Sequence, residues 1–157
     1  MAPSPSRDSV RRSFRWAAAL VVWIAFVWGH SLIQAPQSSA ESGLVVSLLA
    51  PAFRAVGVTD ADAMSFLVRK CAHFSEYAVL GVLARGFFSA RTAETGRPAL
   101  PSGLAVALVP VVDECLQLFV PGRSGQPSDV LIDLAGLLTG VLVSHAAARL
   151  LRARRAS

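Results

Sequence analysis

The chain has 157 residues, of which 54% are hydrophobic and only 16% are charged, and its formal net charge is +5. About a quarter of the residues of a typical soluble domain are charged, so this composition favours a protein that places its apolar surface in a bilayer. The basic residues lie at the chain ends and in one loop, beside apolar segments. Membrane topology explains that distribution better than nucleic-acid binding, so we expect no nucleic-acid partner.

The first apolar segment, Trp16 to Ile33, follows a basic arm formed by residues 1–15. A basic start before an apolar run also occurs in signal peptides, but a segment of about 18 apolar residues has the length of a membrane span. We therefore predict a retained transmembrane helix. A polar loop, Gln34 to Gly43, then leads to the apolar stretch Leu44–Val58, which is too short to cross ~30 Å of hydrocarbon and is expected to be interfacial or re-entrant.

Three further apolar segments predict an all-α bundle of four transmembrane helices. The loops between the spans are polar or rich in turn residues, and a Pro within the third of the four spans predicts a kink. The predicted domain covers residues 16–150, and an Arg-rich tail, residues 151–157, follows it. The predicted spans are Phe66–Ser89, Leu100–Phe119 with Pro110, and Asp129–Leu150, with a polar loop at Arg91–Pro98.

The distribution of Arg and Lys predicts the orientation of the four spans. An even number of spans places both termini on one side of the membrane. The arm, the loop after the second span and the tail hold most of the 15 basic residues, and the other side holds Arg54, Arg69, Lys70 and Arg123. Because basic loops remain in the cytoplasm, we expect both termini to be cytoplasmic.

This orientation brings polar residues of three spans and one loop to a similar depth near the outer face. Charges inside a membrane usually face the interior of the bundle and pair with one another, although interfacial residues can also form purely structural ion pairs. Lys70, His73 and Tyr77 share one helical face by their spacing, and Lys70 and Arg123 could balance two of the acids. The predicted ligand-binding residues are Lys70, His73, Tyr77, Asp113, Glu114, Gln117, Arg123, Ser124, Asp129 and Asp133.

The fourth span carries Asp129, Asp133, Gly136 and Gly140 on one stripe, and the two glycines predict a close helix contact below the acids. No dense metal-binding spacing, phosphate-binding loop or serine-based triad is present in the sequence. We therefore expect no metal, no cofactor and no catalytic residue, although His73 could act either as a general base or as a structural side chain. His30 is not expected to take part.

Three segments resemble the VanZ family. Lys70 to Gly81 resembles its K-x-x-H-F-x-x-Y-x-x-L-G segment, and Asp113 to Ser124 resembles its D-E-x-x-Q-x-F-x-P-G-R-S segment. Asp129 to Gly136 resembles D-v-x-x-N-x-x-G, but Asp133 stands where the family most often has Asn. The resemblance covers nearly the whole chain.

Members of this family are multi-span bacterial membrane proteins, and the founding member is associated with reduced susceptibility to the glycopeptide teicoplanin. The resemblance implies a role in the bacterial cell envelope and a place in the plasma membrane. We expect a non-catalytic protein that binds membrane lipid and an envelope ligand, either a lipid-linked precursor or a glycopeptide. An intramembrane enzyme acting on lipid head groups is the alternative, and a proton- or ion-coupled carrier, which would need a homodimer, is a third hypothesis.

Overall fold

The computed structural model of the chain describes residues 6–32, 35–97, 100–121 and 125–156, and these residues form helices and short connections without a strand. The prediction of an all-α fold is therefore confirmed. The helices are α1 (Arg7–Ser31), α2 (Ala35–Ala55), α3 (Ala61–Thr95), α4 (Leu100–Ala107), α5 (Val109–Gln117) and α6 (Pro127–Ala156).

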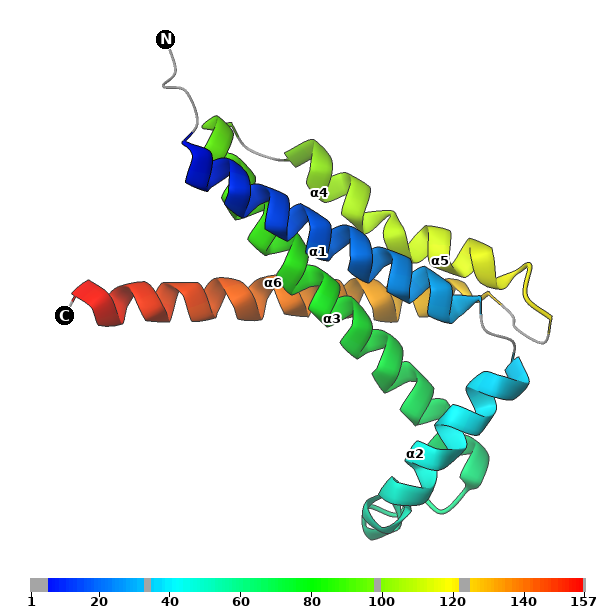
Figure 1. The fold of residues 1–157 in the computed structure, drawn as a ribbon. Coiled ribbons are helices and arrows are strands. Elements are labelled where there is room, and N and C mark those ends of the chain that lie inside the picture. Colours follow the sequence, from blue (N-terminus) through cyan, green and yellow to red (C-terminus); the bar gives the residue numbers. More distant parts are fainter. Residues whose placement is uncertain (1–5, 33–34, 98–99, 122–124, 157) are drawn as a thin grey trace.

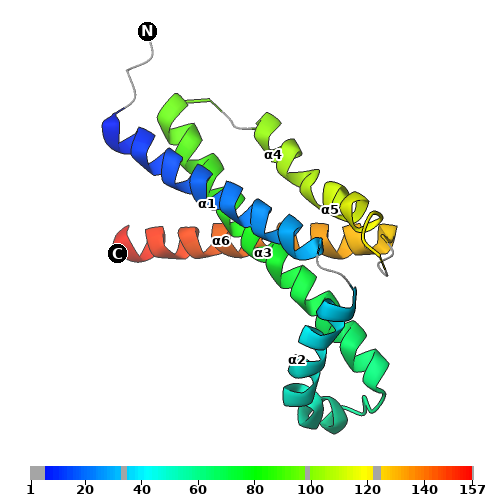
Figure 2. The same ribbon diagram turned by 45° about the vertical axis from the view of Figure 1, so that its right-hand side comes forward.

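The long helix α3 is the centre of the arrangement, and α6, α1 and α2 all pack against it. Helix α1 runs beside the α4–α5 pair, and α6 crosses α3 (Figures 1 and 2). The start of α1, the end of α3 and the start of α4 lie at one end of the bundle, and the chain's C-terminus lies on that same side. The end of α5 and the start of α6 lie at the opposite end.

Helices α3 and α6 touch through their backbones at three glycines. A Cβ atom on Gly136 would lie 2.4 Å from the backbone oxygen of Phe74, and one on Gly140 would lie 1.9 Å from that of Ala78. On the facing helix, a Cβ atom on Gly81 would lie 2.1 Å from a backbone oxygen of α6. The predicted close contact at Gly136 and Gly140 is confirmed, because no residue with a side chain fits at these positions.

Two helices, α1 and α6, are long and apolar enough to cross a membrane. Helix α1 contains the first predicted span as far as Ser31, where the helix ends, and α6 contains the whole of the fourth. Helix α3 contains the second predicted span, and its 35 residues exceed the length that a crossing needs, but it also carries several charged residues.

The third predicted span consists of two helices that meet at Leu108. Helix α4 ends at Ala107, and α5 begins at Val109 with Pro110 in its first turn. Proline has no backbone N–H and its ring clashes with the preceding turn, so a continuous α-helix cannot pass through this position undisturbed. The predicted kink at Pro110 is therefore present as a break in the helix.

Two predicted loops are wrong. The segment Gln34–Gly43 was expected to be a polar loop, but α2 begins at Ala35, and Pro36 is compatible with the first turn of a helix because the N–H groups there have no helical partner. The polar loop after the second span was expected from Arg91, but α3 continues to Thr95 and ends at Gly96, whose φ of 68° favours glycine. Polar residues alone do not end a helix.

Helices α1 and α3 are also joined at the end where the chain starts. Ser13 donates a hydrogen bond to the Glu94 carboxylate, and Arg91 forms an ion pair with Glu94 at 3.1 Å. The hydrogen bond from Ser13, together with Arg91, lowers the pKa of Glu94 below its ordinary value. This connection aligns the first turns of α1 with the last turns of α3.

A Gly140→Ala substitution tests the backbone contact. Because the added methyl group would overlap the backbone of α3, we expect a loss of about 1–3 kcal/mol of stability or more, seen as a lower melting temperature of the purified protein in detergent. Gly29→Ala in α1 is the matched control, since a Cβ atom there meets nothing within 4 Å. Equal melting temperatures for the two variants would contradict the contact.

Candidate functional site

Two ion pairs join α3 and α6 next to the contact at Gly136 and Gly140, on the side toward the start of α6. The Nζ atom of Lys70 pairs with the carboxylate of Asp129. One helical turn further along, the Nδ1 atom of His73 lies 3.6 Å from the Oδ1 atom of Asp133. The spacing of three residues on α3 and of four on α6 places the pairs one above the other. The predicted shared face of Lys70 and His73 is therefore present.

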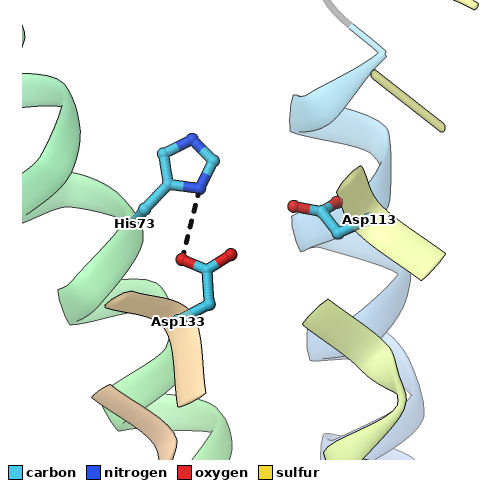
Figure 3. A group of neighbouring side chains, drawn as sticks. All are labelled: His73, Asp113 and Asp133. Atoms are coloured by element: carbon cyan, nitrogen blue, oxygen red, sulfur yellow. Dashed lines mark ion pairs between the residues drawn. The ribbon is translucent and has the colours of Figure 1, made fainter. Parts of the chain in front are cut away.

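Asp113 of α5 approaches the same place from the other side (Figure 3). A ring nitrogen of His73, a carboxylate oxygen of Asp113 and a carboxylate oxygen of Asp133 all lie within 4.8 Å of one another. The two aspartates are fully buried, and His73 is partly exposed. We call these three residues the His–Asp–Asp cluster. Its members come from three helices, so their closeness depends on the packing of α5 and α3 against α6.

The cluster has an unusual shortage of hydrogen bonds. Among the described residues, neither oxygen of Asp113 or Asp133 has a hydrogen-bond partner, and the same is true of the Tyr77 hydroxyl, which is fully buried. A buried polar group without a partner costs on the order of 1–3 kcal/mol, and more when it is charged. Such a cost is tolerated only where the rest of the fold holds the groups in place, and it marks the cluster as a functional candidate.

Glu114 and Gln117 of α5 are buried as well, but they have partners. The Nε2 atom of Gln117 donates a hydrogen bond of 3.2 Å to Glu114, and the backbone N–H of Gln126 donates one of 2.9 Å to its other carboxylate oxygen. The bond from Gln126 connects α5 to the segment that precedes α6, and the bond from Gln117 lies within α5 and orients the Glu114 side chain. In the structure, Glu114 therefore links the elements of the site.

Exposure divides the predicted site into a rim and an interior. The side chains of Lys70, His73 and Asp129 are 21%, 22% and 18% exposed, whereas Asp113 and Asp133 are 0% exposed. A ligand that meets the protein in this conformation can therefore contact only the rim. Arg123 and Ser124, which were predicted to belong to the site, lie outside the described residues.

Sequence reasoning missed the contribution of α1. The Nδ1 atom of His30 lies 2.9 Å from the carboxylate of Glu76, and the indole N–H of Trp23 donates a hydrogen bond of 2.9 Å to the Glu76 backbone oxygen. His30 was expected to be incidental, and the structure pairs it with Glu76, which lies outside the predicted set of ligand-binding residues. The sequence offered one signal, because Glu76 follows His73 by three residues and so lies on the same helical face. The pairing of His30 with Glu76 joins α1 to α3, so the sequence could not show it.

Two helices, α1 and α6, have the length and apolar composition of membrane spans, and together with the match to a family model they indicate a helical membrane protein. The family model described as VanZ/LLP1 matches residues 16–150, which is most of the chain. The protein therefore belongs to the VanZ/LLP1 family, and the resemblance seen in its motifs is confirmed. A search of curated proteins and a search of solved structures each found no match.

The Lys70–Asp129 pair can be measured by a double-mutant cycle with Lys70→Ala and Asp129→Ala. Both side chains are partly buried, so we expect a coupling energy of about 1 kcal/mol, near the upper end of the range for exposed pairs. Thermal unfolding of the four proteins in detergent gives this energy. A control cycle combines Lys70→Ala with Asp62→Ala, because Asp62 is an exposed acid at the start of α3. A coupling for Lys70–Asp129 no larger than in the control cycle would show that the pair contributes nothing.

Proposed function

We propose that this VanZ/LLP1 family member is a non-catalytic protein of the bacterial plasma membrane that binds the anionic head group of a lipid-linked envelope component. The observation that carries the proposal is the gathering of Lys70, His73 and Asp129 at the rim of a buried acidic cluster, at the end of the bundle where α5 ends and α6 begins. Ionisable groups enclosed between membrane helices are costly and usually have a role in binding or transport.

The proposed topology has four crossings, made by α1, α3, the α4–α5 pair and α6. At 1.5 Å per residue, the 18 residues of α4, Leu108 and α5 extend about 27 Å, close to the thickness of the hydrocarbon layer. The start of α1, which carries the arginines of the basic arm from Arg7 onward, the end of α3 and the end of α6 lie on one side of the bundle (Figure 1). The positive-inside rule assigns that side to the cytoplasm, which places the Lys70 rim toward the outer face.

Lys70 is the residue best placed to meet an anionic head group. Its side chain lies at the rim, it is the only lysine of the chain, and its ammonium group lies 5.0 Å from the centre of the Phe66 ring. A phosphate group approaching from the outer leaflet would share this ammonium group with Asp129. Arg123, which lies between α5 and α6 in the sequence, would supply a second cation and suits phosphate because its donors form a fixed fork.

The proposed position of the Lys70 rim at the outer face also suggests how the protein would affect susceptibility to teicoplanin. Lipid-linked wall precursors and glycopeptides are both accessible at the outer face of the membrane. A protein that holds the head group of a precursor there, or that holds the glycopeptide itself, would change the susceptibility of the cell. We propose the lipid-linked precursor as the first ligand, because the rim provides cations for its phosphates.

The alternative function is an intramembrane enzyme that acts on lipid head groups. The His73–Asp133 pair favours it, because a carboxylate beside an imidazole orients the ring and supports acid–base chemistry. Turnover of a lipid-linked substrate by the purified protein, abolished by His73→Gln, would select this alternative. Binding without turnover supports the non-catalytic proposal.

The orientation is tested by reporter fusions. A cytoplasm-active reporter, such as a fluorescent protein, should be active at both ends of the chain, and a phosphatase that requires the outer face should be inactive there. A phosphatase fused after Gln117 should be active, since the proposal places this point outside. The opposite pattern would turn the rim toward the cytoplasm and reject an outer-face site.

The ligand is tested by identifying the lipids that purify with the protein. The wild type is compared with a Lys70→Ala, Arg123→Ala variant and with an Arg54→Ala, Arg69→Ala variant, which loses the same charge on the same proposed side. We expect one anionic lipid to be enriched on the wild type and on the second variant, and to fall by about tenfold or more, or ~1.4 kcal/mol, on the first.

Two outcomes would reject the proposal. Equal loss of the lipid from both variants would show that general charge attraction, rather than a site at Lys70, holds it. A wild type that carries no selectively enriched anionic lipid would show that the rim does not bind such head groups. The orientation test is independent of both outcomes.

A further inference from the structure

The His–Asp–Asp cluster has a second property that the binding of a head group at the rim does not use. We propose that His73, Asp113 and Asp133 bind one divalent transition-metal ion, of the kind of Zn²⁺ or Mn²⁺. The spacing of these residues in the sequence gives no such indication, because they come from three helices and only the packing of the bundle brings them together.

The distances suit a shared ion. The Nδ1 atom of His73 and the Oδ1 atom of Asp133 are 3.6 Å apart, which is too long for a hydrogen bond. Two ligands that each lie ~2.0–2.2 Å from one tetrahedral zinc ion are about 3.3–3.6 Å apart, so this pair can hold an ion without moving. All three ligand atoms lie within 4.8 Å of one another, so Asp113 has to move toward the pair by up to about 1.5 Å.

A comparison within the chain supports this interpretation. His30 and Glu76 form a partly buried His–carboxylate pair at 2.9 Å, which is the distance of a direct hydrogen bond. His73 and Asp133 form the other such pair among the described residues, and their atoms stop short of that distance although Asp133 is fully buried. The longer separation of the His73–Asp133 pair is the one that two ligands of a shared ion require.

The charges also favour a divalent cation. The two fully buried carboxylates accept no hydrogen bond of regular geometry among the described residues, although the hydroxyl groups of Ser31 and Tyr77 lie near Asp113. Hydroxyl groups do not neutralise charge, and one protonated imidazole could neutralise only one of the two carboxylates. A divalent ion neutralises both while the imidazole stays neutral, as a metal ligand must. The nitrogen ligand distinguishes the class of ion, because Ca²⁺ and Mg²⁺ prefer oxygen, whereas Zn²⁺ and Mn²⁺ accept imidazole together with carboxylates.

Tyr77 provides an observation that is independent of the three ligands. Its hydroxyl group is fully buried and has no hydrogen-bond partner among the described residues, and it lies close enough to Asp113 and Asp133 to interact with both. Carboxylates that bind a metal are commonly held by a further hydrogen bond from a neighbouring group. A small rotation of the phenol would let Tyr77 donate such a bond to Asp113.

The backbone contact of α3 and α6 makes the site rigid. Gly136 lies one turn after Asp133, and its Cα hydrogen faces the backbone of Phe74, the residue that follows His73. The helices therefore cannot separate at this level without losing the contact. Ligands that are held in place before the ion binds lose little conformational entropy, which favours binding.

The test uses the full-length protein, purified in detergent without a polyhistidine tag and stripped with a chelator. The wild type is titrated with Zn²⁺, and the bound metal is measured by mass spectrometry after dialysis. Asp133→Asn is compared with Asp129→Asn, the same substitution one turn earlier on the same helix. Co²⁺ is added to the wild type and to His73→Gln, because its visible absorption reports the ligands around the ion.

We expect about one zinc ion per wild-type chain, a similar affinity for Asp129→Asn, and an altered Co²⁺ spectrum for His73→Gln. Loss of a supporting group near a metal costs ~10–100-fold in affinity, so loss of the direct ligand in Asp133→Asn should weaken binding by at least about 100-fold.

The proposal is overturned if the wild type shows no saturable binding, since this result does not depend on how any variant folds. It is also overturned if Asp129→Asn weakens binding as much as Asp133→Asn does, which would indicate a general acidic surface. If Asp133→Asn does not fold, the Co²⁺ spectra of the wild type and His73→Gln decide, and identical spectra would exclude His73 as a ligand. None of these outcomes depends on a lipid ligand.

Discussion

The contact on which the rest of the structure depends is the one between the backbones of α3 and α6. Gly81, Gly136 and Gly140 let the two helices approach until a Cβ atom would overlap the opposite backbone. At this separation the short side chain of Asp133 reaches His73, and Asp129 reaches Lys70. Without a hydrophobic driving force between helices in lipid, such close packing is a main source of their association.

The His–Asp–Asp cluster offsets part of the stability that this packing provides. Asp113 and Asp133 are buried with no hydrogen-bond partner among the described residues, and this arrangement destabilises the folded state unless the charges are neutralised. Glu114 and Gln117 lie nearby and have hydrogen-bond partners, and Glu114 connects α5 to the segment before α6 by accepting a bond from Gln126. The bundle therefore supports an interior whose two carboxylates, without hydrogen-bond partners among the described residues, lower its stability.

Several parts of the site follow from helical spacing within one segment. Lys70 and His73 were predicted to share a face, and both meet α6. The stripe of Asp133, Gly136 and Gly140 was predicted from their spacing, and all three are buried. Spacing could not show that Asp113 joins this stripe or that His30 reaches Glu76, because each of these contacts joins helices that are distant in the chain.

The sequence by itself determined the helical class, the apolar segments, the break at Pro110 and the side chains that share each helical face, because these depend on local periodicity and on the chemistry of single residues. It also carried the motifs of the VanZ/LLP1 family. Only the tertiary structure decided which polar side chains meet, how deeply they are buried and where they lack partners. Those properties depend on how α3 crosses α6 and on where α5 packs, and both arise from packing across the whole bundle.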